Sequence, residues 1–190
     1  MNVPREKQRT KSAAAGFTLI EVIVIVAILA ILAGILAPMI FRQIDDAKLA
    51  RAEADCKSIS SAILIFRKDL GVWPNRMGAG CPEATQLIRG EGNLPTELAA
   101  MSFLSANVVN FNDVLMTDDE GCYTPALYKG PYMPNVTADP WGNSYVVAAS
   151  NFETGNTDPV FVLSAGPNGT METPITSVSP LGDDIGIRVK

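Results

Sequence analysis

An apolar run from Phe17 to Phe41 constrains this chain more than any other feature. Only one of its 25 residues, Glu21, is charged. A helix of that length rises about 37 Å, which is enough to cross a bilayer. A carboxylate inside such a helix costs a few kcal/mol if it has no partner. The sequence therefore predicts a membrane-spanning helix over residues 17–41 in which Glu21 is neutralised.

A basic segment precedes the apolar run and places the N-terminus in the cytoplasm by the positive-inside rule. A secretory signal peptide is cleaved after its apolar part, whereas here the small residues Ala13–Gly16 come before it. We expect cleavage after Gly16, which makes residues 1–16 a leader and gives Phe17 a free amine. That amine is the expected partner of Glu21, on the same helix or on a neighbouring one.

The segment Gly16–Glu21 resembles the processing site of type IV pilins and of the pseudopilins of type II secretion. In that family a membrane peptidase cuts after the glycine and methylates the new N-terminal phenylalanine. The resemblance implies processing at Gly16 and Phe17. It implies assembly roles for Phe17, Glu21 and Pro38, which falls where the family carries a helix-kinking proline. The alternative is a simple signal anchor with a coincidental glycine and glutamate.

Residues 42–70 continue the helix in amphipathic form. A stripe of mostly apolar or small side chains advances by threes and fours, which predicts one face packed on the rest of the chain. Gly71 is expected to end the helix, and Pro38 to interrupt it by removing one backbone hydrogen bond. The stripe consists of Ile44, Lys48, Ala52, Cys56, Ile59, Ile63, Phe66 and Leu70.

Residues 71–190 are expected to form a globular head. Strands are predicted at Ser144–Ala149 and Pro159–Ser164, with a closing strand at Ile185–Val189. Short helical turns are predicted at Glu83–Ile88 and Glu97–Leu104. A long helix followed by a small antiparallel sheet is an α+β fold, and the resemblance makes it type IV pilin-like.

The chain has three cysteines, an odd number for an oxidising compartment. Cys56 lies on the apolar stripe, where a free thiol behaves as a small hydrophobe. Cys81 and Cys122 both lie in loop-like sequence, and we expect them to form a disulfide. Pairing of Cys56 with either loop cysteine, or no disulfide at all, stays open.

The C-terminal half narrows the resemblance to the major pseudopilins of type II secretion. Asp139–Tyr145 is similar to their DPWGNPY turn, and Ser164–Gly169 followed by Gly182–Ile185 resembles the loop in which that subfamily binds calcium. The ligands that the resemblance and calcium's preference for oxygen imply are Ala165, Asn168, Asp183 and Asp184. Asn168 stands where the subfamily tends to have aspartate, and solvated carboxylates in an ordinary loop are the alternative.

Charge and composition limit the function classes. From Phe17 onward the chain carries 11 basic and 19 acidic side chains, and the whole chain has no histidine. An acidic chain without a basic stripe argues against nucleic acid as a partner, and the missing histidine removes histidine-based triads and metal sites.

The resemblance implies a subunit anchored in the bacterial inner membrane that assembles with itself into a pseudopilus for protein secretion, its head in the periplasm or in an extracellular fibre. Its expected partners are a prepilin peptidase, other pilins or pseudopilins and an inner-membrane assembly platform. A type IV pilus subunit is the alternative; a membrane-anchored enzyme or a monomeric binding module is more remote.

Overall fold

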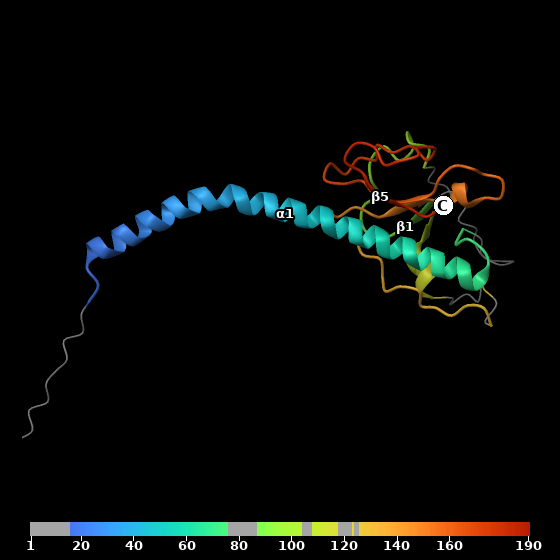
Figure 1. Ribbon diagram of the computed structural model, residues 1–190, viewed down its shortest axis with the longest axis horizontal. Coiled ribbons are helices and arrows are strands. Elements are labelled where there is room, and N and C mark those ends of the chain that lie inside the picture. Colours follow the sequence, from blue (N-terminus) through green and yellow to red (C-terminus); the bar gives the residue numbers. More distant parts are fainter. Residues whose placement is uncertain (1–15, 76–86, 104–107, 118–122, 124–125) are drawn as a thin grey trace, which may run out of the picture. The chain divides into compact units, whose positions relative to one another are not determined.

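A computed structural model describes residues 16–75, 87–103, 108–117, 123 and 126–190 (Figure 1). The chain divides into two compact units, one ending at Ile44 and one spanning Asp45–Lys190. The predicted disulfide between Cys81 and Cys122 lies outside the described residues and stays a prediction.

One helix, α1, covers Leu19–Leu70 and contains Pro38. α1 continues through Pro38, so the backbone hydrogen bond that this proline cannot donate does not end the helix. At its other end, the backbone N–H of Gly71 donates to the carbonyl of Arg67 at 2.8 Å, and Gly71 has φ +75°. Glycine adopts this left-handed conformation at little cost, so the predicted helix end is confirmed.

The first part of α1 is apolar and unpacked. Every residue from Leu19 to Phe41 is exposed, and α1 is the one helix in the described chain that is long and apolar enough to cross a membrane. Exposed side chains of this kind need an apolar environment, which a bilayer or a bundle of similar helices supplies.

The head contains a mixed sheet of five strands in the order β2-β1-β3-β4-β5. Strands β3, β4 and β5 fall within the predicted segments. Because β1 pairs in parallel with β2 and antiparallel with β3, the expected purely antiparallel sheet is corrected to a mixed one. The strand bounds are Leu87–Arg89 for β1, Val108–Asn110 for β2, Val146–Ala148 for β3, Phe161–Ser164 for β4 and Ile185–Arg188 for β5.

Two further predictions concerned short helical turns. The turn predicted at Glu83–Ile88 is wrong at its described end, because Leu87 and Ile88 belong to β1. At Glu97–Leu104 the described residues form turns, with one helix-like bond from the N–H of Met101 to the carbonyl of Glu97. Short helices elsewhere are η1, Asn112–Met116, and η2, Ala149–Phe152.

Apolar residues pack on both faces of the sheet. One core joins the stripe of α1, including Cys56, Ile59, Ile63 and Phe66, to residues such as Val147 and Val162. Val146 and Leu163, their neighbours on the same strands, belong to a second core with Met171 and Ala165. Successive side chains along β3 and β4 point to opposite faces of the sheet. α1 therefore packs on one face and the C-terminal loops on the other (Figure 1).

Candidate functional site

The N-terminus of α1 is closed by a reciprocal pair of side chains. Glu21 Oε2 accepts the backbone N–H and the hydroxyl of Thr18, both at 2.8 Å. The backbone N–H of Glu21 in turn donates to Thr18 Oγ1 at 3.4 Å. This is a capping box, in which a threonine and a glutamate three residues later satisfy each other's free N–H groups. Glu21 therefore has a partner within its own chain even without the Phe17 amine.

Thr18 was missed as a functional residue, although the spacing of threonine and glutamate is the sequence signature of a capping box. The structure brings Thr18 to Glu21, and the pairing of Glu21 with a free Phe17 amine stays a prediction. Gly16 lies just before the cap, and a Cβ added there would meet no atom within 4 Å. The folded chain thus sets no steric requirement for glycine, so such a requirement would come from whatever enzyme binds this segment.

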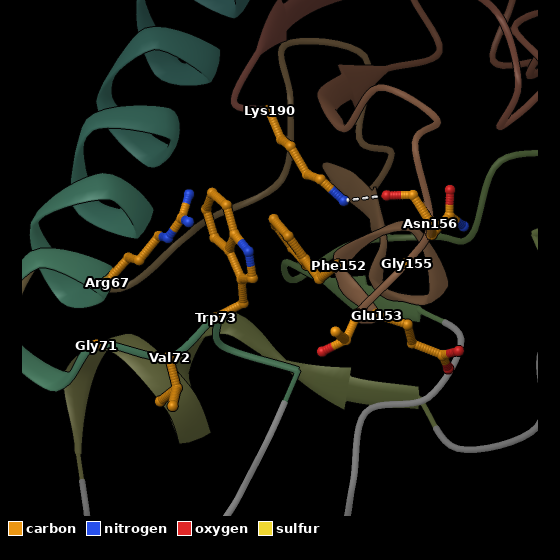
Figure 2. A pocket seen from close by; sticks show the side chains of 10 residues that line it. Arg67, Gly71, Val72, Trp73, Phe152, Glu153, Gly155, Asn156 and Lys190 are labelled. Carbon is orange, nitrogen blue, oxygen red and sulfur yellow. Dashed lines mark hydrogen bonds between the residues drawn. The ribbon is translucent and has the colours of Figure 1, made fainter.

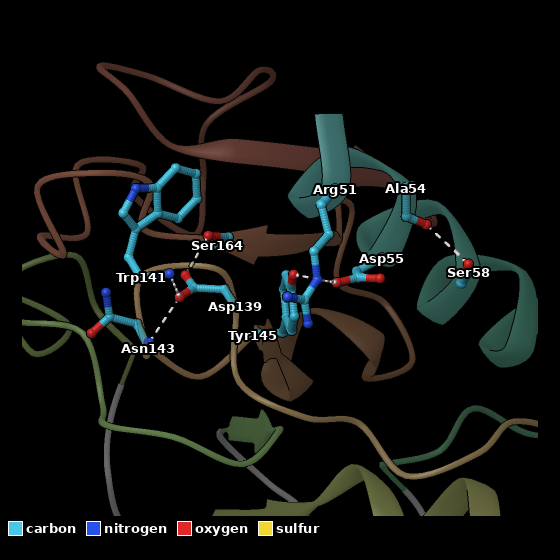
Figure 3. Close-up of polar contacts among 9 residues, drawn as sticks. All are labelled: Arg51, Ala54, Asp55, Ser58, Asp139, Trp141, Asn143, Tyr145 and Ser164. Carbon is cyan, nitrogen blue, oxygen red and sulfur yellow. Dashed lines mark hydrogen bonds and ion pairs between the residues drawn. The ribbon is translucent and has the colours of Figure 1, made fainter. Parts of the chain in front are cut away.

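The Asp139–Asn143 turn is organised by one buried carboxylate (Figure 3). Asp139 Oδ1 accepts the backbone N–H groups of Trp141 at 3.0 Å and Asn143 at 2.8 Å. Its Oδ2 accepts the hydroxyl of Ser164, in β4, at 2.6 Å. Both oxygens are satisfied, so Asp139 ties the turn to the sheet and has a structural role.

The seam between α1 and the sheet holds a second polar group. The hydroxyl of Tyr145 donates to Asp55 Oδ2 at 2.9 Å, and Arg51 Nε lies 3.6 Å from the same oxygen (Figure 3). Cys56, next to Asp55, is a free buried thiol. Burial, reinforced by Asp55, raises the pKa of this thiol to about 12. Cys56 is therefore an unreactive core residue, as the sequence predicted.

The predicted calcium ligands all lie in the loop region between β4 and β5, and a hydrogen bond joins two of them, Asn168 and Asp183. Asp183 Oδ2 accepts the N–H of Asn168 at 3.1 Å. Asp184 Oδ2 accepts the N–H groups of Glu172 at 2.9 Å and Thr173 at 2.7 Å. Ala165 is fully buried at the end of β4. Glu172, which sequence reasoning missed, joins these acids because its Oε2 accepts the N–H of Asp183 at 3.1 Å.

Two carboxylate oxygens in this region fit a bound cation. Asp183 Oδ1 and Asp184 Oδ1 are buried and have no hydrogen-bond partner among the residues that the structure describes. Burial also raises the pKa of Asp184, opposed by the hydrogen bonds from Thr173 and Glu172. Such oxygens are costly unless a proton or a cation reaches them. Within the described ranges, however, no group of three or more His, Cys, Asp or Glu has metal-site geometry, so Asn168 and backbone carbonyls would have to supply the remaining ligands.

The turn geometry keeps this loop tight. Gly182 has φ +61°, and a Cβ there would lie 1.5 Å from Glu172 Oε2. A Cβ on Gly166, at φ +63°, would lie 2.2 Å from the carbonyl oxygen of Asp183. The backbone contact excludes a side chain at Gly166, whereas at Gly182 the Glu172 side chain can shift and the left-handed φ is what favours glycine.

A separate pocket of about 370 Å³ lies between the end of α1 and the turn after η2 (Figure 2). The Arg67 guanidinium carbon lies 3.7 Å from the ring centroid of Trp73, which stacks on Phe152 at 4.6 Å. Lys190 Nζ donates to the carbonyls of Asn151 at 2.7 Å and Asn156 at 2.8 Å. The aromatic rings that line this pocket stack on each other, and its lysine is bonded to backbone carbonyls. Packing of the head therefore accounts for these side chains.

Comparison with known proteins supports the resemblance that the sequence indicated for the N-terminal segment and for the head. Residues 11–37 match the prokaryotic N-terminal methylation motif. Residues 112–177 match the family described as type II secretion system protein G. The first match covers the predicted cleavage site and the start of α1, and the second covers the turn at Asp139 together with β3 and β4.

Three relatives are similar to most of the chain, and each is named type II secretion system core protein G. The Pseudomonas aeruginosa protein is 28% identical over 82% of this chain and 84% of its own length. The Escherichia coli K12 protein is 27% identical over 83% of this chain and 85% of its own length. The Aeromonas hydrophila protein is 24% identical over 90% of both chains. No solved structure is significantly similar. The two matched segments and these relatives show that the chain is similar to the type IV pilins and pseudopilins, and over most of its length to core protein G of type II secretion.

Proposed function

We propose that this chain is the filament subunit of a type II secretion pseudopilus. One observation carries the proposal: a single chain joins the methylation motif at the start of α1 to a protein G head. The family is structural, and the apolar first part of α1 anchors the protein once through the inner membrane. The head then lies on the periplasmic side, because the basic leader stays in the cytoplasm.

Assembly follows from the exposed surface of α1. All residues from Leu19 to Phe41 are exposed in the part of their unit that the structure describes. Bundling of these helices with those of other copies would cover them when subunits leave the bilayer. A prepilin peptidase would first remove residues 1–16 and expose the Phe17 amine. That amine, on an adjacent subunit, would then bind Glu21 by a charge-assisted hydrogen bond.

Deletion of the gene tests this function. We expect proteins normally exported by type II secretion to remain in the periplasm of the deletion strain. Re-expression of the wild-type chain should return them to the medium. Normal export without the chain would contradict the proposal, whereas loss of surface adhesion alone would favour a type IV pilus subunit.

Calcium is the cofactor that the loop between β4 and β5 would hold. Asp183 and Asp184 would supply carboxylate oxygens, Asn168 an amide oxygen and Ala165 a backbone carbonyl, all of the oxygen type that calcium prefers. The two buried oxygens without partners support this proposal. Bound calcium would neutralise these acids and fix the loop to β5.

We expect calcium to raise the melting temperature of the chain lacking residues 1–41, and chelator to lower it. At a hundredfold excess over its dissociation constant, calcium stabilises by about 2.7 kcal/mol. Asp184→Asn should abolish the difference. Asparagine is the informative substitution because its amide oxygen can still accept the N–H groups of Glu172 and Thr173, which alanine would leave unpaired. Superimposable melting curves for the parent chain with calcium and with chelator would contradict the site.

The calcium effect should also depend on pH. Because burial raises the pKa of Asp184, the ionised group destabilises the calcium-free head, and stability should rise as pH falls through that pKa. Calcium needs the ionised form, so its stabilising effect should shrink over the same pH interval. Asp184→Asn, which does not titrate, provides the control for this trend.

A further inference from the structure

A groove of about 510 Å³ lies between α1 and the segment that leads into β5. Four residues of α1 line one side: Asp46, Leu49, Ala50 and Glu53. Pro180, Ile185 and Ile187 are among the residues of the other side. All four helix residues are exposed, with Leu49 at 39%. Asp184 also lines the groove, which therefore combines apolar residues with three carboxylates and is not filled by any of the described residues.

A second exposed surface lies further along α1. Its outer face carries Ser61, Leu64, Ile65 and Lys68, which project to the same side because they are three or four residues apart. Leu64 and Ile65 are 45% and 50% exposed, although the adjacent Ile63 and Phe66 are fully buried. This outer face is apolar with a basic end, whereas the groove is apolar with an acidic edge.

The two surfaces share one spacing along the helix. A shift of 15 residues pairs Leu49 with Leu64 and Ala50 with Ile65. The same shift pairs Glu53 with Lys68, an acid with a base. At 1.5 Å per residue it corresponds to about 22 Å along the helix axis. One displacement thus matches apolar with apolar residues and opposite charges with each other.

From this register we propose that the outer face of α1 in one copy docks into the α1 groove of a second copy displaced by about 22 Å along parallel helices. The docking rests on the proposed filament function. Membrane insertion gives every copy the same orientation, so the helices are parallel, and such a contact repeats from copy to copy into an open filament. Glu53 Oε1 contacts Lys57 Nζ at 2.5 Å within its own chain. This pair is exposed and weak, and Glu53 can exchange Lys57 for Lys68 of the second copy.

Disulfide cross-linking tests the register in the full chain expressed with its secretion system. Leu49→Cys combined with Leu64→Cys should give a ladder of covalent dimers, trimers and larger species in isolated filaments after oxidation. The two positions cannot join within one chain because they lie about 22 Å apart on one helix. Each single variant measures the background from the native cysteines. Leu49→Cys combined with Ser58→Cys is the matched control, because Ser58 is exposed but precedes Leu64 by six residues, so the proposed register leaves it about 9 Å along the axis from Leu49 of the second copy, too far for a disulfide.

Charge exchange provides an independent test. Lys68→Glu should lower filament yield roughly tenfold, because it places a second carboxylate opposite Glu53. Combining it with Glu53→Lys should restore the yield. Asp45→Lys combined with Lys68→Glu is the control for this restoration. Asp45→Lys changes the charge by the same amount as Glu53→Lys, but Asp45 does not line the groove.

The outcomes separate this docking from the function on which it rests. Parent filaments without the cross-linked ladder, or a charge exchange that fails to restore yield, would overturn the docking and leave the filament function intact. A parent chain that forms no filaments in a functioning secretion system would overturn both. A ladder from the Leu49 and Leu64 pair, absent from the Ser58 control, is the result expected.

Discussion

Gly16→Leu should block maturation, so that the full-length chain accumulates in the membrane with Met1 still attached. The reason lies in the peptidase, because a Cβ at Gly16 meets nothing within 4 Å in the chain itself. A branched side chain next to the cleaved bond would not fit an enzyme that selects glycine. Mass spectrometry of the purified chain distinguishes the precursor from a product that begins at methylated Phe17.

Gly16→Ala is the matched control for this variant, because it adds only one methyl group at the same open position. We expect partial cleavage of Gly16→Ala and essentially none of Gly16→Leu. A normally trimmed and methylated Gly16→Leu chain would show that the match of residues 11–37 to the methylation motif does not reflect cleavage at this bond.

Glu21→Ala should leave cleavage intact and abolish filament assembly. The carboxylate is the only charge between Phe17 and Phe41, and a charge-assisted hydrogen bond to the amine of an adjacent subunit contributes roughly 1.5–3 kcal/mol. Loss of that energy weakens each subunit addition about 10- to 100-fold. Electron microscopy and sedimentation of sheared filaments measure the loss, while membrane fractionation shows that insertion is retained.

The capping box makes Glu21→Gln the informative control. Glutamine can still accept the N–H and hydroxyl of Thr18, so it keeps the helix cap but lacks the negative charge. We expect Glu21→Gln to fail as Glu21→Ala does, and Thr18→Ala to assemble better than either. Normal filaments from Glu21→Gln would mean that Glu21 serves the cap of its own helix rather than pairing with a neighbour.

Sequence reasoning succeeded where a periodic pattern is long or a local rule is strong. The stripe through Cys56 and Phe66 predicted the buried face of α1, because apolar residues recur every three or four positions over several turns of the helix. Gly71 predicted the end of α1 because a left-handed residue terminates a helix. β4, Phe161–Ser164, lies within the predicted strand Pro159–Ser164, a run of residues that favour strands.

The missed features depend on contacts between distant parts of the chain. β1 is only three residues long, and its pairing with β2 in parallel and β3 antiparallel cannot be read from Leu87–Arg89 alone. Glu172 reaches Asp183 only through the fold of the loop between β4 and β5. At Pro38 the local rule gives one lost hydrogen bond but does not tell whether the helix ends there, and α1 continues.

Secretion by a strain whose only copy of the chain carries Gly16→Leu tests the filament function most directly. The fraction of type II substrates in the medium should fall to the level of the deletion strain, while wild-type and Gly16→Ala copies should support export. This result would tie maturation at Gly16 to secretion through the assembled subunit. Export at the wild-type level from cells that contain only the uncleaved Gly16→Leu chain would contradict the proposed function.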